Sequence, residues 1–587
     1  MWWILAGLRV ATFLFYLNPA ILTSMKKLIL SVVVSLFAAA SLAAQTHNSV
    51  PLDDPIYFLL ETASIKGYCT LPAIRPYSQK TILKALEQIA ASDDASPLER
   101  DSAQAAILRL QPPSQEAWYK TGRLNFNYDT ASGLKNRLGL GVNLSAHIGS
   151  NFTKPSFTWE AILDAWVNGD FTKYFSYKLL MAAGLSHYDF DAYPPYTFSQ
   201  PYDGFQFLLN PMGDFTAKSQ DGHIGMKIQP ELSFGFGDGM LSINFSRIRR
   251  DWQLAQGVGG LLLAGSARPF MALDIYFSPT KWLQLAFLNG VLEYNRADSD
   301  TIRPFDFQNS FTAMKAQFGL GKYVDAAINS AVVFTKRFEM GYFNPLMVPL
   351  FYQNMVGDFD NLYFGGTLVV KIPRWGRIFA DILLSEIRSL DIVYTPQNVY
   401  AWQAGGQLAI PGSPTTITLQ YTKIEPFMYT HYGTITPWTG DTEMNTSLVN
   451  HGEGIGSNLP PNTDELKLSA TGMPLLFLEW NASYRMVRHG ITPPGSTYEP
   501  TEYSDMPDRK HFLHDGVYQW QHIFTVGCSY TMQQLHIPIN IFCDLGLVYS
   551  YHTDTTDASS SVIHRINTSE YPNRLSVLGK IGVKVFP

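Results

Sequence analysis

The stretch Arg137–Ile148, RLGLGVNLSAHI, decides the fold because apolar and polar residues alternate through all twelve of its positions. One row is Leu138, Leu140, Val142, Leu144, Ala146 and Ile148, and the other is Arg137, Gly139, Gly141, Asn143, Ser145 and His147. Successive side chains of a strand point to opposite faces. A strand that crosses a bilayer at a tilt needs about 9 to 11 residues. The stretch therefore predicts a transmembrane β-strand with one face toward lipid and one toward an aqueous interior.

The same alternation returns, interrupted by turns, from Trp118 to Phe586. It is clear at Leu124–Tyr128 and again at Arg574–Val585, where the polar row carries three cations. A weaker copy runs over Phe171–Leu179, in which Lys173 interrupts the apolar row. Residues that favour chain reversal stand at Asn168-Gly169, at Gly237-Asp238-Gly239 and at Pro411-Gly412-Ser413-Pro414. Together these features predict an all-β, antiparallel transmembrane barrel.

The composition separates this barrel from its main alternative, a large soluble all-β protein. Aromatic residues make up 14%, charged residues only 16%, and the mean hydropathy is −0.03. Transmembrane barrels combine these traits because aromatic girdles mark both interfaces while the interior stays polar. The mature chain has no run of about 18 apolar residues for a spanning helix, and a bilayer admits only helices and closed barrels. We therefore expect a protein in contact with lipid of the outer membrane of a diderm bacterium.

The N-terminal region predicts export. Lys26 and Lys27 precede the apolar run Leu28–Ala40 and the small-residue cleavage site Ser41-Leu42-Ala43, which is the pattern of a secretory signal. We interpret residues 25–44 as the signal peptide and residues 1–24 as an over-extended gene start. A membrane anchor built from Trp2–Leu22 is the alternative, although Arg9, Asn18 and Pro19 interrupt it.

Residues 45–114 predict a small α-helical domain on the periplasmic side, because the apolar period changes there to about 3.6. Pro55 should open a helix that Gly67 ends, and Ser78 should cap a second. Ser96-Pro97-Leu98-Glu99 has the form of a capping box for a third helix. A domain of this size buries little surface by itself. We therefore expect this head to dock on the barrel's periplasmic mouth. Residues 115–587 remain for the barrel, which has room for about 18 strands, within 16 to 20, if each strand and connection takes about 26 residues.

A cationic and aromatic cluster is the candidate binding site. It comprises Arg247, Arg249, Arg250, Trp252 and Arg268. Alternation should aim Arg247 and Arg249 at the lumen, because a lipid-facing arginine near the midplane costs about 2 to 4 kcal/mol. Arginine forks bind carboxylates and phosphates, and tryptophan offers a flat face to a sugar ring. The alternative is an internal network of ion pairs with luminal acids.

This cluster, together with the glycine-rich stretch Gln256–Phe270, resembles the Wzi-like family of capsule assembly proteins. Three further stretches are similar to that family: Pro51–Pro55 with Pro76–Ser78, Phe343–Leu346 with Gly357–Asn361, and Gly454–Asp464. The resemblance implies an outer-membrane barrel of about 18 strands with a periplasmic helical bundle. It also implies that the barrel binds or anchors an anionic or neutral surface polysaccharide. The alternatives are a porin or oligosaccharide channel and an adhesive protein that uses the tyrosines of Tyr188–Gly222.

The remaining motifs are weak. Asp358, Asp360 and Asn361 predict a hydrogen-bonded luminal network or an ion site, since oxygen-rich clusters suit calcium. HExxH, GxSxG and CxxC motifs are absent from the sequence, so we expect neither an enzyme nor a metal or other cofactor; scattered histidines leave a Ser-His hydrolase as a minor alternative. A net charge of −6 argues against nucleic-acid binding. Phe586, near the C-terminus, predicts recognition by the outer-membrane insertion machinery. Cys528 and Cys543 are expected to be fillers, or else a pair on neighbouring strands.

Overall fold

The structure is a computed structural model. It describes residues 47–111, 118–129, 135–153, 157–187, 215–218, 223–253, 260–292, 309–335, 339–356, 360–391, 393–431, 434–435, 443–444, 446–450, 453–499, 506–555 and 562–586. The predicted signal peptide, the segment before it and the tyrosines of 188–213 lie outside these ranges, so those interpretations and the domain boundaries stay predictions.

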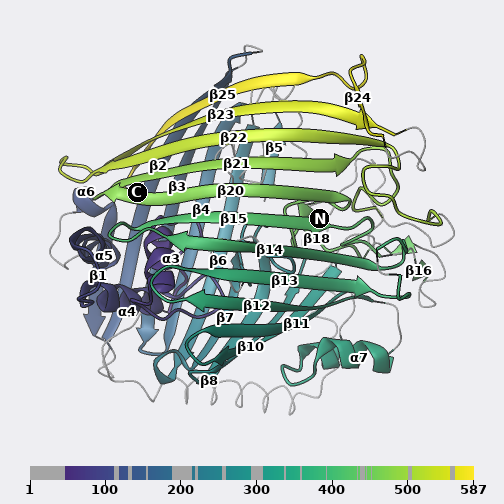
Figure 1. Cartoon of the computed structure of the whole chain (residues 1–587). Coiled ribbons are helices and arrows are strands. Elements are labelled where there is room, and N and C mark those ends of the chain that lie inside the picture. Colours follow the sequence, from purple (N-terminus) through teal and green to yellow (C-terminus); the bar gives the residue numbers. More distant parts are fainter. Residues whose placement is uncertain are drawn as a thin grey trace, which may run out of the picture.

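Within the described residues, eighteen antiparallel strands close into a barrel, as predicted (Figure 1). The ring strands are β2 (Lys135–Asn151), β3 (Phe157–Thr172), β4 (Phe175–His187), β6 (His223–Phe236), β7 (Leu241–Ile248), β8 (Phe270–Thr280), β9 (Leu283–Val291), β10 (Asn309–Leu320), β11 (Val324–Thr335), β12 (Asn361–Ile372), β13 (Gly376–Glu386), β14 (Val399–Ala409), β15 (Thr415–Ile424), β20 (Thr463–Leu475), β21 (Leu478–Gly490), β22 (Val517–Met532), β23 (Ile539–Asp554) and β25 (Arg574–Val585). The last strand, β25, pairs with β23 on one side and with β2 on the other, which closes the ring.

Short strands extend the sheet beyond the ring. β1 (Arg123–Asp129) pairs with the first part of β2, and β25 pairs with its later part from Leu144 onward. β5 (Phe215–Lys218) lies beside the first residues of β6, and β24 (His564–Ile566) lies beside the last residues of β23. Two small hairpins, β16 (Thr434–Ile435) with β17 (Glu443–Met444) and β18 (Val449–Asn450) with β19 (Glu453–Gly454), belong to the connection between β15 and β20.

The stretch that predicted the fold is strand β2, and its two rows face as expected. Leu140, Val142, Leu144 and Ile148 are 41 to 49% exposed on the outside. The opposite row faces the lumen, where His147 lies 3.7 Å from the carboxylate of Glu160 on β3. The apolar row is therefore the surface for lipid.

Two of the three predicted turns are confirmed. Gly237–Gly239 reverses the chain between β6 and β7, and Pro411–Pro414 lies between β14 and β15. The turn predicted at Asn168-Gly169 is wrong, because both residues lie inside β3. Asn168 pairs with Gly139, where a Cβ would come within 2.5 Å of the Asn168 amide oxygen. The glycine across the strand, rather than a turn, accommodates this asparagine.

The weak alternation at Phe171–Leu179 is not one strand. β3 ends at Thr172 and β4 begins at Phe175, so Lys173 lies in the tight turn between them. Lys173 interrupts the apolar row because the chain reverses there, and water can reach a side chain in such a turn.

The two ends of the barrel differ in the length of their connections. At one end, no connection between ring strands is longer than the six residues 533–538. The other end carries residues 249–269, 425–462 and 491–516. Outer-membrane barrels have short periplasmic turns and long extracellular loops. We therefore refer to a short-turn end and a long-loop end.

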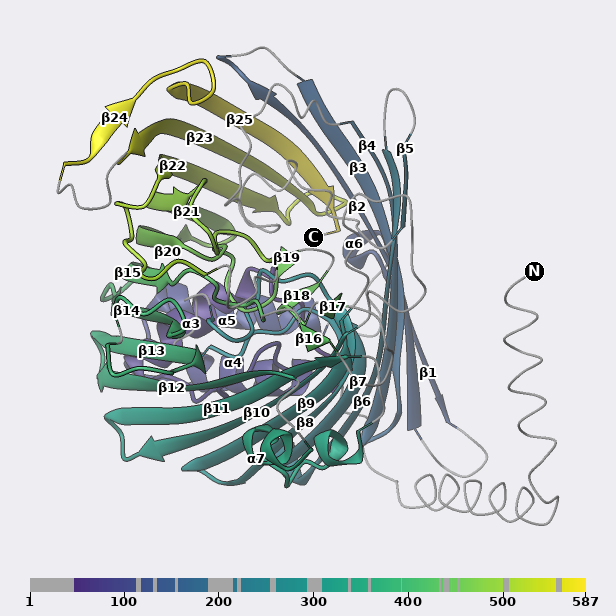
Figure 2. The ribbon, with the colours of Figure 1, turned by 90° about the vertical axis from the view of Figure 1, so that its right-hand side faces the viewer.

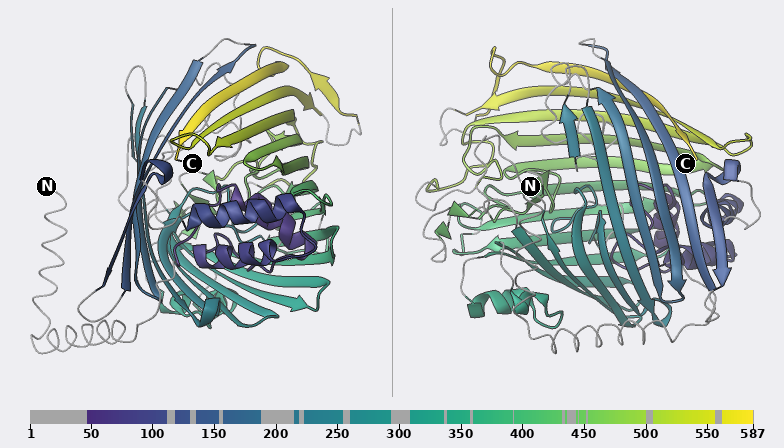
Figure 3. Two further views of the ribbon diagram at one scale, coloured as in Figure 1. Left: turned by 90° about the vertical axis from the view of Figure 1, so that its left-hand side faces the viewer. Right: turned by 180° about the vertical axis from the view of Figure 1, so that it is seen from behind.

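The three head helices form where the sequence predicted them: α3 (Ile56–Lys66), α4 (Gln79–Ala90) and α5 (Pro97–Leu110). Gly67 ends α3 in the left-handed conformation, and Ser78 and Ser96 cap the next two helices, the latter in a full capping box. Their apolar stripes pack into one cluster that includes Leu60, Leu86 and Ala103. Figure 3 shows the helices lying across the opening at the short-turn end.

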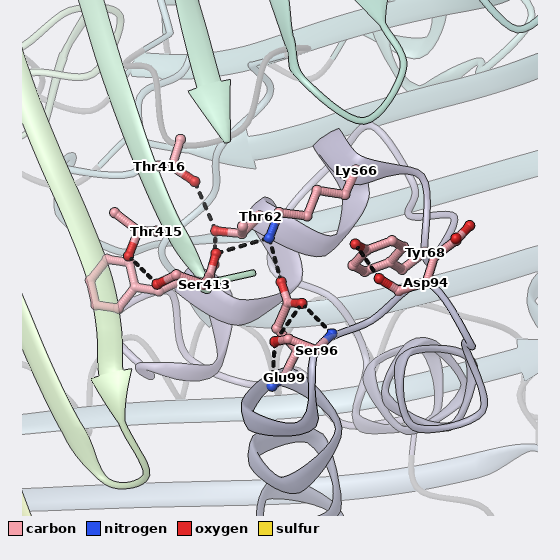
Figure 4. Close-up of polar contacts among 10 residues, drawn as sticks. Thr62, Lys66, Tyr68, Asp94, Ser96, Glu99, Ser413, Thr415 and Thr416 are labelled. Atoms are coloured by element: carbon pink, nitrogen blue, oxygen red, sulfur yellow. Dashed lines mark hydrogen bonds and ion pairs between the residues drawn. The ribbon is translucent and has the colours of Figure 1, made fainter. Parts of the chain in front are cut away.

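The head is fixed to the barrel by polar contacts from α3 (Figure 4). Lys66 donates to the Glu99 carboxylate at 2.6 Å and to the Ser413 carbonyl at 2.9 Å, so one buried ammonium joins two head helices and the β14–β15 turn. Thr62 and Thr416 hydroxyls lie 2.8 Å apart. The head thus docks on the mouth of the barrel at the short-turn end, through named atoms.

The described residues contain no helix long and apolar enough to cross a membrane. Cys528 and Cys543 are directly opposite each other on β22 and β23, and both are free thiols, as is the buried Cys69 of the head. The neighbouring-strand arrangement considered from the sequence therefore exists, without a disulfide.

Candidate functional site at the long-loop end

Two long connections fold into the barrel (Figure 2). Their described parts, 249–253 with 260–269 and 425–431 with 446–450 and 453–462, are called the plug. Large apolar side chains of the plug, each at most 5% exposed, include Trp252, Leu261, Leu262, Leu263, Phe427, Met428, Tyr429, Leu448, Ile455 and Leu459. They pack against inward-facing residues of the strands, among them Phe311, Tyr363 and Leu578. The plug and the strands that it contacts therefore form a packed hydrophobic core inside the barrel.

The two halves of the plug bind each other directly. The Tyr429 hydroxyl donates to the Leu261 carbonyl at 2.8 Å, and the Ala264 amide donates to the Ile455 carbonyl at 2.9 Å. At Gly456 a Cβ would lie 2.5 Å from the Leu261 carbonyl oxygen, so the close approach needs glycine. Two stretches that carried the family resemblance, Gln256–Phe270 and Gly454–Asp464, therefore meet in space.

Arg250 is a structural residue of the plug rather than an exposed contact. Its side chain is 2% exposed and binds both oxygens of Asp274, at 2.7 to 3.0 Å. It also donates to the carbonyls of Ser246, Ile248 and Phe270. These partners occupy the whole guanidinium fork, so this fold leaves Arg250 no donor for the predicted sugar contact.

Arg249 reaches the lumen, as predicted, and pairs with the head. Its guanidinium lies 2.9 Å from the Asp53 carboxylate. It also lines a cavity of about 40 Å³ with Lys178, Lys227 and Glu231 at the junction of head and barrel. Arg249 therefore joins the plug to the periplasmic head.

Trp252 and Arg268 lie at different depths. Trp252 is 5% exposed inside the core, so this fold leaves little of its ring open for the predicted stacking on a sugar. Its carbonyl accepts from the ammonium of Lys315. Arg268 pairs with Glu453 of the β18–β19 hairpin at 2.7 Å and keeps 16% of its side chain exposed. The ion-pair network considered as the alternative thus describes Arg249, Arg250 and Arg268.

Arg247 does not face the lumen, which corrects the prediction. It shares its row on β7 with Phe245, which is 48% exposed on the outside. The guanidinium donates to the Ile228 carbonyl of β6 at 3.2 Å. Within β7 the side chains alternate between the two faces as expected. The strand ends at Ile248, however, so the direction of the Arg249 side chain does not follow from that alternation.

The predicted oxygen cluster is divided between two surroundings. The Asp360 carboxylate accepts from the Tyr342 hydroxyl at 2.9 Å, whereas the Asn361 amide donates to the Thr446 carbonyl of the luminal loop at 3.0 Å. Asp358 lies outside the described residues. Asp360 and Asn361 therefore take part in two separate hydrogen-bond networks, of which only that of Asn361 reaches a luminal loop.

An exposed cluster at the long-loop end was not found from the sequence. Tyr394, in the β13–β14 connection, is 43% exposed. The Arg509 guanidinium of the β21–β22 connection lies 4.7 Å from its ring centroid and 3.8 Å from Asp391. His511 lies against the same ring, with 6.0 Å between the ring centroids. An exposed aromatic with a stacked cation suits a sugar that bears a carboxylate or phosphate.

A buried lysine fixes this exposed cluster. Lys510 lies between Arg509 and His511, and its ammonium is 3.1 Å from the Glu425 carboxylate and 2.7 Å from the Asn398 carbonyl. Burial lowers the pKa of Lys510, although Glu425 acts in the opposite direction. The cation-rich run Asp508–His511 was the sequence signal, but loops carry no alternation that would have shown which of its members is exposed.

Comparison with known proteins supports the fold. No family model and no curated protein matches this chain. The solved structure of Wzi from Escherichia coli, described as an outer-membrane protein involved in group 1 capsule assembly and a carbohydrate-binding β-barrel, has a TM-score of 0.53 and 10% identity. It covers 92% of this chain and 99% of its own. This likeness shows that the chain has the Wzi-like outer-membrane barrel fold, as the resemblance implied.

Two solved structures from Pseudomonas aeruginosa are also similar over part of the chain. OprD matches with a TM-score of 0.37 and 10% identity, over 76% of this chain and 94% of its own. OpdK, solved with vanillate, matches with a TM-score of 0.38 and 8% identity, over 76% and 97%.

Proposed function

We propose that this chain is a non-enzymatic outer-membrane barrel that holds surface polysaccharide at its long-loop end. The observation that carries the proposal is the plug, whose apolar side chains are at most 5% exposed inside the barrel. A porin needs a continuous aqueous path lined by polar residues. A packed hydrophobic core inside the barrel supports a binding protein in preference to the porin or oligosaccharide channel.

Polysaccharide contact is assigned in this proposal to the exposed cluster of Tyr394, Arg509 and His511, with Arg268 as a further contact. Arg509 is 55% exposed on its side chain, whereas Arg250 is 2% exposed. A ligand can therefore reach Arg509 without unfolding the plug. The stacked guanidinium favours an anionic glycan over a neutral one, since charge-assisted hydrogen bonds are about twice as strong as neutral ones.

The experiment is retention of the purified full-length barrel, in detergent, on immobilised acidic and neutral polysaccharides. The Tyr394→Ala, Arg509→Ala double variant should lose at least about tenfold in affinity for an acidic glycan, which corresponds to about 1.4 kcal/mol. Arg374→Ala is the matched control, because this arginine is 69% exposed at the short-turn end and pairs with Asp94. Equal retention of the double variant and the control, or no retention of the wild type on any glycan, would remove the proposal.

A further inference from the structure

The connection between β11 and β12 folds over the outside of the barrel, not into it (Figure 2). Its described part, 339–356, contains a short 3-10 helix (Met340–Phe343) and α7 (Pro349–Val356), and is called the flap. Ile328, 51% exposed, shows which row of β11 faces outward. Val332 and Phe334 belong to that row, yet both are at most 1% exposed because the flap covers them.

Hydrogen bonds and ring contacts hold the flap against the strands. The Tyr342 ring packs on Phe334 with 4.6 Å between the ring centroids. The Tyr342 carbonyl accepts from the side chains of Asn289 and Thr312, each at 3.2 Å. The Leu350 amide donates to the Ser330 hydroxyl at 3.2 Å. Polar residues that would otherwise face lipid on β9, β10 and β11 are satisfied by this segment.

The exposed side chains of the flap are mostly apolar, with Asn344 and Asn354 as polar exceptions. Exposed apolar residues of the flap, with their exposed fractions, are Met340 71%, Phe343 42%, Leu346 89%, Phe351 59%, Met355 71% and Val356 39%. Glu339 is the one ionisable acid or base in 339–356, and its carboxylate accepts from the Tyr352 hydroxyl at 3.0 Å. A mostly apolar exposed surface of this kind marks a surface that another apolar phase covers.

The flap lies at the height where the outer interface of a bilayer would fall. At the short-turn end, Trp282, Tyr323 and Trp375 are 51 to 57% exposed and mark the inner interface. The apolar band of such barrels is about 25 Å tall, and tilted strands climb about 2.5 Å per residue, so the band spans about ten residues. Ten residues along β11 from Tyr323, the apolar band ends at Val333, which lies between the covered residues Val332 and Phe334.

We propose that residues 339–356 form an interfacial element whose apolar face docks into the outer leaflet, with lipid as its occupant. The choice of lipid rests on continuity: the strand beside the flap carries Phe364 and Leu368 in its outward row, 40% and 48% exposed. The apolar surface of the flap thus joins the surface that the barrel presents to the bilayer. An amphipathic helix in such a position buries its apolar face about 5 to 10 Å into the headgroup and acyl boundary. This inference does not depend on glycan binding.

The test uses the full chain in nanodiscs with an environment-sensitive NBD dye on an introduced cysteine. The background carries Cys69→Ser, Cys528→Ser and Cys543→Ser, and the probe positions are Leu346→Cys and, as a second flap variant, Met355→Cys. Leu390→Cys is the matched control, because Leu390 is 99% exposed in the loop 387–398 at the same end. Heat-modifiable migration on a gel confirms that each labelled barrel is folded.

The flap dyes should be quenched at least twofold more by lipids brominated on the acyl chain than the Leu390 dye, and protected from aqueous iodide. Iodide quenching of flap and control dyes to the same extent would overturn the proposal. Protection from both quenchers, with a dimer on chemical cross-linking, would also overturn it, in favour of a second copy of this chain.

Discussion

Arg75 of the head and Asp251 of the plug exchange both backbone hydrogen bonds, each at 2.9 Å, and their side chains form a buried ion pair. A residue of the periplasmic head therefore makes a two-residue antiparallel bridge with a loop that descends from the opposite end of the barrel. The head therefore holds the plug at this point, in addition to the hydrophobic contacts within the plug itself. Head and plug should consequently behave as one cooperative structure inside the barrel.

Asp251→Ala should release this connection. Removing one partner of a buried ion pair typically costs about 3 to 5 kcal/mol, because the remaining charge stays buried. We expect faster proteolysis of the head and a lower midpoint of thermal unfolding in detergent. Arg374→Ala, at the exposed pair with Asp94, is the control and should change stability by less than about 1 kcal/mol. Identical protease sensitivity of the two variants would show that the bridge does not hold the head.

Arg250→Lys should destabilise the plug although it keeps the charge. A lysine ammonium cannot reproduce the planar fork that binds both Asp274 oxygens and three backbone carbonyls. Each buried acceptor left without a donor costs about 1 to 3 kcal/mol. The free energy of unfolding, measured by denaturant titration, should fall by about 3 kcal/mol or more. A wild-type value for this variant would mean that the fork geometry is unimportant.

Attachment of the N-terminal segment should weaken in acid. His47 donates through Nε2 to the Lys173 carbonyl at 2.9 Å, and burial lowers the pKa of His47 below its usual 6.5 despite this hydrogen bond. The folded ring is therefore neutral where the unfolded one takes up a proton. The stabilisation is full above pH 6.5 and declines as the pH falls below it.

Hydrogen exchange of residues 47–50 at pH 7.5 and 5.5 measures this effect. Protection should drop at the lower pH in the wild type, and the drop should vanish in His47→Gln. Protection that is the same at both pH values would contradict the assignment of a neutral, buried imidazole.

Gly456→Val should separate the two halves of the plug. Even a Cβ at this position would meet the Leu261 carbonyl oxygen at 2.5 Å, and backbone cannot yield as a flexible side chain does. Overpacking of this kind typically costs about 1 to 3 kcal/mol. The variant should remain a folded barrel by heat-modifiable migration but gain hydrogen exchange at Leu261–Ala264. Gly412→Val, at a turn where a Cβ would meet nothing, controls for loss of glycine but also carries the strain of its positive φ.

Periodic features could be predicted from the sequence because each residue of a strand or helix reports the same two environments. Local rules are enough to predict the two side-chain rows of β2, the approximate number of strands and the capping box at Ser96. The error at Asn168-Gly169 has a non-local cause, since the partner glycine Gly139 lies on another strand. The residue types of a short segment do not show which residue of the neighbouring strand will lie opposite it.

The site was harder to predict because it is built from loops. Arginines and a tryptophan close together in sequence were interpreted as one ligand surface, yet Arg247 faces outward, Arg250 and Trp252 are buried, and Arg268 pairs with Glu453. Tyr394 and Arg509, which do meet at the surface, are separated by more than a hundred residues. Pairing of such distant residues depends on how long loops pack, which periodicity does not encode.

If the packed plug closes the lumen, the purified barrel in a planar lipid bilayer should carry no steady ion current, and conductance measures this. The wild type should insert and stay silent, while deletion of 425–462 with a short glycine-serine linker should open steady channels of nanosiemens scale. Stable channels of that size from the wild type would contradict the closed lumen and favour a porin.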